Sequence, residues 1–188
     1  MIFQNIPNIL SVSRILLAPL FFVFLTTDII LYVWLSIFIF FLGSLTDAVD
    51  GYIARKYKLE SKFGKHLDPI ADKVFIITSF FSLMYVMPDY VRIWMLLIII
   101  LRDVFVTYLR KISEYRGLDF KTNYFAKRKT LVQVITIHLI LLIYILEKYY
   151  AFKISLDIVY YLMIVSVSVT FLSGISYWKQ YTSLVYEK

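Results

Sequence analysis

Apolar residues fill six long stretches of the chain, and short polar stretches separate them. A helix needs about 20 predominantly apolar residues to cross a bilayer, so this pattern predicts transmembrane helices. We expect a short interfacial segment ahead of the first span, because Pro7 suits a lead-in better than a span interior. The six predicted spans cover residues 9–27, 29–53, 69–87, 91–109, 131–146 and 154–178.

Composition also indicates a membrane protein. Hydrophobic residues make up 61% of the 188 residues, and the mean hydropathy is +0.76, whereas soluble domains contain roughly 45–50% apolar residues. Six spans leave only short connections, so we expect one all-α integral membrane domain over residues 1–188. The first apolar run has no basic start and no small-residue cleavage pattern, so we interpret it as a retained span. Because cysteine is absent, any metal would bind oxygen or nitrogen ligands.

Basic residues gather in alternate connections between the spans. Five lie in 55–66 and seven in 110–130, whereas the remaining connections carry Arg92, Lys148 and Lys153. The positive-inside rule therefore predicts that the two basic connections and both termini lie on the cytoplasmic side of the cell membrane. We attribute the net charge of +7 to this topology and to contacts with anionic lipid or phosphorylated substrates, and we expect no nucleic-acid partner.

Four aspartates occur at membrane depth, where charge is costly. The first two end the second span and share one helix face with Gly51 and Ala54, at ~100° per residue. The other two begin the third span one turn apart, with Pro69 expected in the first helical turn. Because these spans are consecutive, their acidic faces can meet. The four residues are Asp47, Asp50, Asp68 and Asp72.

Four ionised carboxylates in one partly dehydrated place would repel each other unless they were protonated or neutralised by cations. Oxygen ligands suit Mg²⁺ or Mn²⁺. Two such ions would bind a pyrophosphate, stabilise charge on the leaving group and activate an attacking hydroxyl. Gly51 and Ala54 would let a ligand approach the backbone. The alternative is that each aspartate pairs with a lysine or arginine of the basic connections.

The spacing of these residues resembles the signature of the CDP-alcohol phosphatidyltransferase family, with every interval intact over residues 47–72. The matching positions are Asp47, Asp50, Gly51, Ala54, Arg55, Gly64, Asp68 and Asp72. The resemblance implies a six-helix membrane fold, usually a homodimer, in which the first three aspartates hold two divalent ions. It also implies that Asp72 completes the metal site and acts as the general base on an acceptor hydroxyl.

The same resemblance implies a donor site for CDP-diacylglycerol. The signature residues expected to line its cytidine diphosphate are Gly51, Ala54, Arg55 and Gly64. Ser61 in the basic connection and Asn8 and Ser11 at the start of the first span are further candidates. Loop polarity or helix capping is the alternative role for these three.

Other stretches resemble the phosphatidylglycerophosphate synthases of this family, in particular residues 5–14, 67–73, 102–117 and 127–133. Asp103, where they carry Glu, and Ala126, where they carry Gly, depart from the pattern. The resemblance implies transfer of a phosphatidyl group to glycerol 3-phosphate in phospholipid biosynthesis. The basic residues expected to bind the acceptor phosphate are Arg102, Arg110, Lys127 and Lys129, for which positive-inside topology alone is the alternative.

Three other functions stay open at this point. A CDP-alcohol-type cardiolipin synthase would use phosphatidylglycerol as the acceptor. A membrane prenyltransferase also binds pyrophosphate through aspartates and Mg²⁺, but it does not predict the spacing of Gly51, Ala54, Arg55 and Gly64. A cation transporter would use the aspartates as an ion pathway. We expect no catalytic role for His66 or His138.

Overall fold

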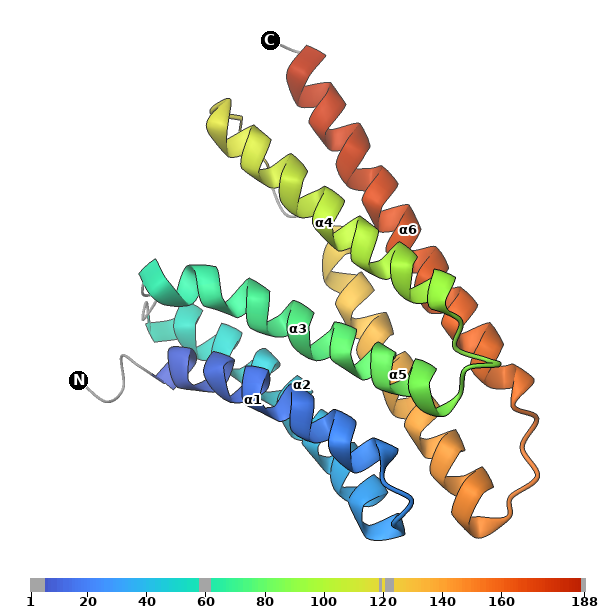
Figure 1. The fold of residues 1–188 in the computed structure, drawn as a ribbon. Helices are drawn as coiled ribbons and strands as arrows, with labels where there is room; N and C mark the ends of the chain where they lie inside the picture. The colour runs from blue at the N-terminus through green and yellow to red at the C-terminus, as the bar shows by residue number, and fades with distance from the viewer. Residues whose placement is uncertain (1–5, 58–61, 119, 121–123, 187–188) are drawn as a thin grey trace. The chain divides into compact units, whose positions relative to one another are not determined.

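The computed structural model describes residues 6–57, 62–118, 120 and 124–186, and within these it leaves out the side chains of 6–7, 47–57, 62–66 and 124–127. This part of the chain contains helices and no strand (Figure 1). The helices are α1 (Ile6–Thr26), α2 (Ile30–Tyr57), α3 (Lys62–Val86), α4 (Ile93–Tyr115), α5 (Tyr124–Tyr150) and α6 (Asp157–Tyr186). The predicted all-α class is confirmed.

Within the part of the chain that the structure describes, four helices are long and apolar enough to cross a membrane, over Asn8–Thr26, Leu67–Val86, Arg128–Tyr150 and Asp157–Tyr186. The chain is therefore a multi-pass membrane protein. In α2 the apolar stretch within the described side chains is shorter, Ile30–Thr46. Helix α4 carries Arg102, Asp103 and Arg110 close together, which lowers its hydropathy. Pro7, expected in an interfacial lead-in ahead of the first span, lies in the first turn of α1, directly before the apolar stretch that begins at Asn8. Residues 1–5 lie outside the described part.

Several helices continue past the predicted spans into the basic connections. Helix α3 begins at Lys62 rather than at residue 69, and α4 ends at Tyr115 rather than at residue 109. Apolar side chains mark only the part of a helix that meets lipid, whereas the backbone hydrogen bonds can continue into water. The expectation that Pro69 lies in the first turn is therefore wrong, because about two turns of α3 precede it.

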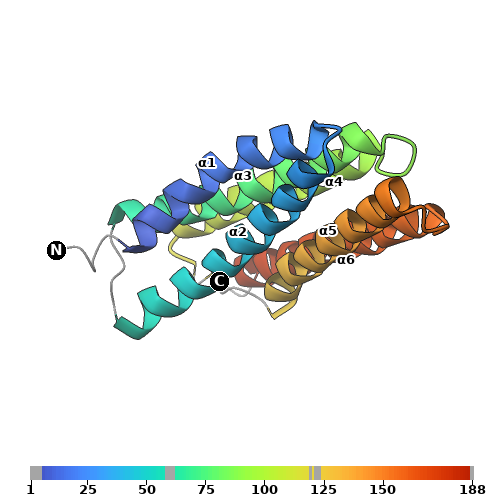
Figure 2. The ribbon, with the colours of Figure 1, turned by 90° about the horizontal axis from the view of Figure 1, so that it is seen from below.

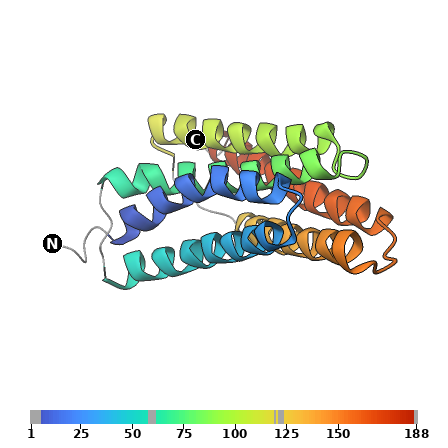
Figure 3. The same ribbon diagram turned by 60° about the horizontal axis from the view of Figure 1, so that its bottom comes forward.

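One compact unit comprises Met1–Pro88 and Ile137–Ile154. In this unit α1 packs against both α2 and α3, and Figure 3 shows α1 between them. Figure 2 shows α1 and α2 running in opposite directions on either side of their short connection. The core is aromatic: the Phe40 ring lies 5.8 Å from that of Phe21 and 5.4 Å from that of Phe75.

A glycine allows part of this aromatic packing. A Cβ atom at Gly43 would lie 2.4 Å from the Phe75 Cζ atom, well inside van der Waals contact. Phe75 is only 2% exposed, so its ring has little room to move away. Gly43 therefore lets α2 and the ring from α3 approach each other, four residues before the first signature aspartate.

The second compact unit comprises Asp89–Thr136 and Ser155–Lys188. Helix α4 packs along α6, and Val106, Leu109 and Tyr177 form a buried cluster between them. The first part of α5 belongs to this unit as well, because the Gln133 side-chain amide donates a hydrogen bond of 3.0 Å to the Thr170 hydroxyl on α6.

A glycine with positive φ follows the end of helix α4. Gly117 has φ of 63°, a left-handed conformation that glycine adopts without steric cost. Its N–H donates to the Glu114 carbonyl, and the Leu118 N–H donates to the Ser113 carbonyl at 2.8 Å. These bonds satisfy carbonyls that the helix end would otherwise leave without partners.

Candidate active site

Two of the four predicted aspartates lie on the described part of α3. Asp68 and Asp72 are one turn apart and partly buried, so they share a face as the sequence predicts. The Ser11 hydroxyl on α1 donates a hydrogen bond to Asp68 Oδ1. Ser11 is fully buried, and the packing of α1 on α3 brings it to the acidic face.

An arginine on α1 extends this contact. Arg14 follows Ser11 by one turn, is only 1% exposed, and directs its Nη2 atom to the Ser11 Oγ atom at 3.4 Å. Guanidinium, hydroxyl and carboxylate thus form a chain from Arg14 through Ser11 to Asp68. Sequence reasoning used Arg14 only as part of a resemblance and missed this role. The available signal was a charged residue within an apolar run, one turn from Ser11.

The rest of the predicted acidic and donor site is described only in part. The side chains of Asp47, Asp50, Ala54 and Arg55 on α2, and the surroundings of Gly51 and Gly64, are outside the described residues, and so is Ser61. Asn8 is partly buried on α1, one turn before Ser11. Among the side chains that are described, no group of three or more potential metal ligands occurs. The meeting of the two acidic faces therefore stays a prediction.

A buried ionic cluster lies in the second unit. Asp103 on α4 accepts a hydrogen bond of 2.6 Å from Lys129 Nζ on α5 and one of 2.9 Å from Arg102 Nη1, both at its Oδ1 atom. The three side chains are 7%, 8% and 10% exposed, respectively. Charges this deeply buried need partners, so Asp103 serves here as a counter-ion.

The structure thus brings together two of the four basic residues predicted to bind the acceptor phosphate. Arg102 and Lys129 meet at Asp103, and the Arg102 guanidinium also lies 5.4 Å from the centre of the Tyr177 ring. Arg110 is exposed two turns further along α4, and the Lys127 side chain is outside the described residues. Sequence reasoning noted Asp103 only as a departure from the family pattern and missed its role as a counter-ion, although an acidic residue beside an arginine in an apolar run could have indicated a buried pair.

Comparison with known proteins identifies the family. A family model described as CDP-alcohol phosphatidyltransferase matches residues 4–172. The chain belongs to the CDP-alcohol phosphatidyltransferase family. The resemblance seen in the aspartate signature is thereby confirmed, and it extends well beyond that signature, into α6.

Three curated relatives to which the chain is similar carry the name CDP-diacylglycerol–glycerol-3-phosphate 3-phosphatidyltransferase. The Rickettsia typhi protein is 33% identical over 177 residues, which cover 94% of this chain and 96% of that protein. The Bacillus subtilis protein is 33% identical, covering 73% of this chain and 77% of that protein. The Cereibacter sphaeroides protein is 37% identical over 73% of this chain, and the match spans 63% of that protein's length.

CDP-alcohol phosphatidyltransferases use divalent metal ions, and the described part of the signature fits such ions. Asp68 and Asp72 offer the hard oxygen ligands that Mg²⁺ and Mn²⁺ prefer. Asp68 receives its hydrogen bond from a neutral hydroxyl, which fixes the carboxylate without cancelling its charge. Such a partner is typical of the groups that orient metal ligands.

Of the two histidines, only His138 has a described side chain. Its ring packs against two aromatic rings of α2, 4.7 Å from that of Phe40 and 6.2 Å from that of Phe41. These surroundings are those of an interior side chain in the first unit. The His66 side chain is outside the described residues.

Proposed function

We propose that this chain transfers the phosphatidyl group of CDP-diacylglycerol to glycerol 3-phosphate, giving phosphatidylglycerophosphate and CMP. The relatives' shared name states this acceptor. The observation that carries the proposal is the partly buried pair Asp68 and Asp72 on one face of α3, with the Ser11 hydroxyl bound to Asp68. These are the last two aspartates of the signature that defines the family.

We infer that two divalent ions, Mg²⁺ or Mn²⁺, are held together by Asp47, Asp50, Asp68 and Asp72. When bound, these ions would offset the charge of the carboxylates and stabilise charge that develops on the pyrophosphate. Ser11 would orient Asp68 for this task. Buried Arg14, which contacts Ser11, would hold the hydroxyl in place from the other side.

Asp72 is our candidate for the general base. It would accept the proton of the C1 hydroxyl of glycerol 3-phosphate while that oxygen forms a bond to the β-phosphorus of CDP-diacylglycerol. The bond between this phosphorus and the bridging oxygen then breaks, and CMP leaves with the bridging oxygen. The position of Asp72 one turn after Asp68 supports this role, because the two carboxylates then lie on the same face of α3.

The donor nucleotide would lie along Gly51, Ala54, Arg55 and Gly64, with Asn8, Ser11 and Ser61 as further contacts. The Ser11 hydroxyl already donates a hydrogen bond to Asp68. In a contact with CDP-diacylglycerol, its oxygen would therefore accept a hydrogen bond. Asn8 lies one turn earlier on α1 and would reach the same side of that helix as Ser11.

For the acceptor phosphate, we keep Arg110, Lys127 and Lys129 as the favoured ligands. Exposed Arg110 can offer a bidentate contact. Lys129 lies in the buried cluster with Arg102 and Asp103, to which the phosphate of glycerol 3-phosphate would add a further anion. Arg102 was predicted to share this task. On the side of its guanidinium that faces away from Asp103, Arg102 is surrounded by apolar side chains. These surroundings favour a ligand other than glycerol 3-phosphate.

We further infer that residues 1–188 act as one domain, that the protein lies in the cytoplasmic membrane with both termini in the cytoplasm, and that it forms a homodimer. The positive-inside bias supports the orientation, and the family resemblance supports the dimer. Reporter fusions at each end would test the orientation, since an active periplasmic reporter at either end would contradict it.

An acceptor screen tests the proposed reaction. Purified protein in detergent, supplied with CDP-diacylglycerol and Mg²⁺, should release CMP only when glycerol 3-phosphate is present, and a chelator should abolish the release. Release that requires phosphatidylglycerol would instead indicate a cardiolipin synthase. A prenyltransferase or a transporter would give no acceptor-dependent CMP release. The Asp72→Asn variant, checked for folding, is the matched negative control.

A further inference from the structure

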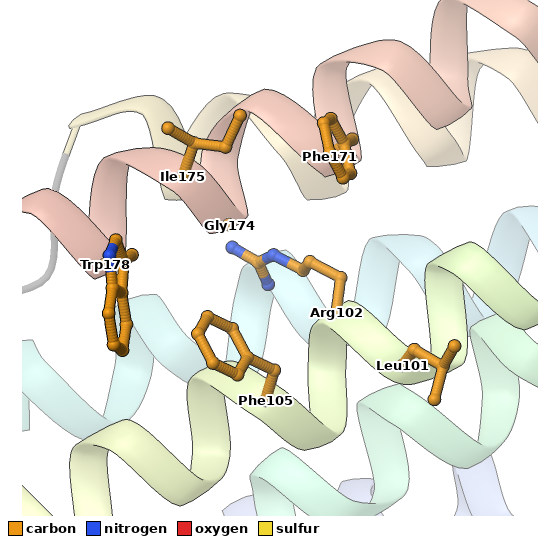
Figure 4. Close-up of a pocket in the computed structure, with 7 residues that line it drawn as sticks. All are labelled: Leu101, Arg102, Phe105, Phe171, Gly174, Ile175 and Trp178. Atoms are coloured by element: carbon orange, nitrogen blue, oxygen red, sulfur yellow. The ribbon is translucent and has the colours of Figure 1, made fainter.

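A pocket of about 490 Å³ lies within the second unit, between α4 and α6. Apolar side chains make up most of its wall: Phe105 from α4 and Phe171, Ile175 and Trp178 from α6. Arg102 also lines it, and Figure 4 shows the guanidinium in the space near Gly174, with Phe105 and Trp178 beside it. The wall therefore combines one cationic group with a large apolar surface.

Only part of the Arg102 guanidinium is satisfied. Its Nη1 atom donates to Asp103, and the side chain is nine-tenths buried. The Nε and Nη2 atoms are buried and have no hydrogen-bond partner among the described residues. These two atoms form one edge of the guanidinium, the edge that binds two oxygens of a single phosphate or carboxylate side by side.

The neighbours of Arg102 leave that edge available. The centre of the Tyr177 ring lies 5.4 Å from the guanidinium carbon, within the range of a cation–π contact. The counter-ion Asp103 contacts the Nη1 atom with the same oxygen that accepts from Lys129. Because Arg102 shares its counter-ion with Lys129 and has two donor atoms without a partner among the described residues, binding of an additional anion would be favourable.

The rest of the wall indicates what kind of anion would bind. Apart from the indole N–H of Trp178, no lining side chain other than Arg102 carries a polar group. The hydroxyls of a small polyol phosphate would find few partners here, whereas an acyl chain would fit. Phe171 and Trp178 are 57% and 47% exposed, so the groove opens along the apolar surface of α6, which is long enough to cross the bilayer.

We propose that this groove binds an anionic phospholipid. The phosphate would accept hydrogen bonds from Nε and Nη2 of Arg102, and an acyl chain would lie along Phe105, Phe171 and Trp178. Gly174 keeps the space open, because a Cβ atom there would come within 3.2 Å of Arg102 Cγ. The site is independent of turnover, so it does not require the proposed reaction.

Tryptophan fluorescence tests the proposal directly. Replacing Trp34 and Trp94 by phenylalanine leaves Trp178 as the single tryptophan. In bilayers of phosphatidylcholine, bromine-labelled phosphatidylglycerol should then quench Trp178 about fivefold more effectively than bromine-labelled phosphatidylcholine. Both Arg102→Gln and Arg102→Lys should lose this preference, the second because lysine keeps the charge without the two-pronged edge. Arg110→Gln, on the same helix but exposed, should keep the preference.

Four results would overturn the proposal. Equal quenching by the two lipids would remove the need for an anion, and a preference that survives in Arg102→Lys would remove the role of the guanidinium edge. Relief of quenching by added glycerol 3-phosphate would make the groove part of the acceptor site instead. Weak quenching by both lipids, with Trp178 cross-linking to a second copy, would show that protein covers the groove. Arg102→Lys carries the test if Arg102→Gln fails to fold.

Discussion

Two carboxylates, one in each unit, are held by different kinds of partner: Asp68 by a hydroxyl and Asp103 by two cations. In the first unit, Asp68 accepts a hydrogen bond from the neutral Ser11 hydroxyl and is partly exposed. In the second unit, Asp103 is buried and binds two cations, Arg102 and Lys129. A hydroxyl orients a carboxylate but leaves its charge, whereas two cations offset that charge. The comparison indicates that Asp68 is prepared for an external cation and Asp103 is a structural counter-ion.

The largest expected effect is on turnover. Asp72→Asn should lower the rate of CMP release by about 10²–10⁴-fold, because a general base contributes that much, while CDP-diacylglycerol still binds. Single-turnover CMP release and donor binding are the measurements. Asp50→Asn is the matched comparison and should chiefly raise the Mg²⁺ concentration needed. Equal residual rates and equal metal affinities in the two variants would contradict this division of roles.

Replacing the counter-ion Asp103 should change stability rather than turnover. Asp103→Asn should destabilise the protein by about 3–5 kcal/mol, because it leaves buried cations without their carboxylate. Thermal unfolding in detergent measures the loss, and Asp89→Asn, on the exposed α3–α4 connection, is the control. If the variant keeps its stability but loses metal affinity, Asp103 would belong with the metal-binding acids and the contrast between the units would fail.

The two units should also respond differently to a methyl group at a glycine. Gly43→Ala should cost about 1–3 kcal/mol of unfolding free energy, because the new Cβ would meet the buried Phe75 ring at 2.4 Å. Gly174→Ala should cost less, because its nearest neighbour is Arg102 Cγ at 3.2 Å, on a flexible side chain. Equal losses of stability would argue against tight packing at Gly43.

A smaller effect tests the hydroxyl that orients Asp68. Ser11→Ala should weaken Mg²⁺ affinity by about tenfold, the lower end of the range for groups that orient metal ligands. Ser13→Ala is the same substitution on the same helix, and among the described residues the Ser13 hydroxyl bonds the Leu10 carbonyl in α1, at 2.8 Å. An Mg²⁺ titration of activity compares them, and equal half-saturating concentrations would show that Ser11 does not act through Asp68.

The smallest effect concerns an exposed pair at the far end of the first unit. The Lys148 ammonium, hydrogen-bonded to Asp28 at 2.6 Å, lowers the pKa of Asp28 below its ordinary value of 3.8. A lowered pKa adds stability above the ordinary value, and this gain is lost as the pH falls through the lowered one. Asp28→Asn should therefore unfold at a slightly lower temperature at pH 7, and the difference should vanish as the pH falls below the lowered pKa of Asp28. A difference that is constant with pH would contradict the ion pair.

Local patterns were enough to predict several features. Six apolar stretches predicted six helices, and the interval of four residues between Asp68 and Asp72 predicted their common face, because helix geometry fixes both relations along one segment. The signature predicted the family for the same reason, since its residues lie within residues 47–72. The helix ends were predicted less well, because backbone hydrogen bonds continue after the apolar pattern stops.

Contacts between distant segments needed the tertiary structure. Ser11 and Asp68 lie 57 positions apart, and Asp103 and Lys129 lie 26 apart. Which side chains meet depends on how α1 packs on α3 and on the register between α4 and α5, and hydropathy specifies neither. The sequence alone was enough to place acidic and basic residues at membrane depth. Only the packing of the helices decided that one acid faces a hydroxyl, another binds two cations, and Arg102 presents its remaining donors to an apolar groove.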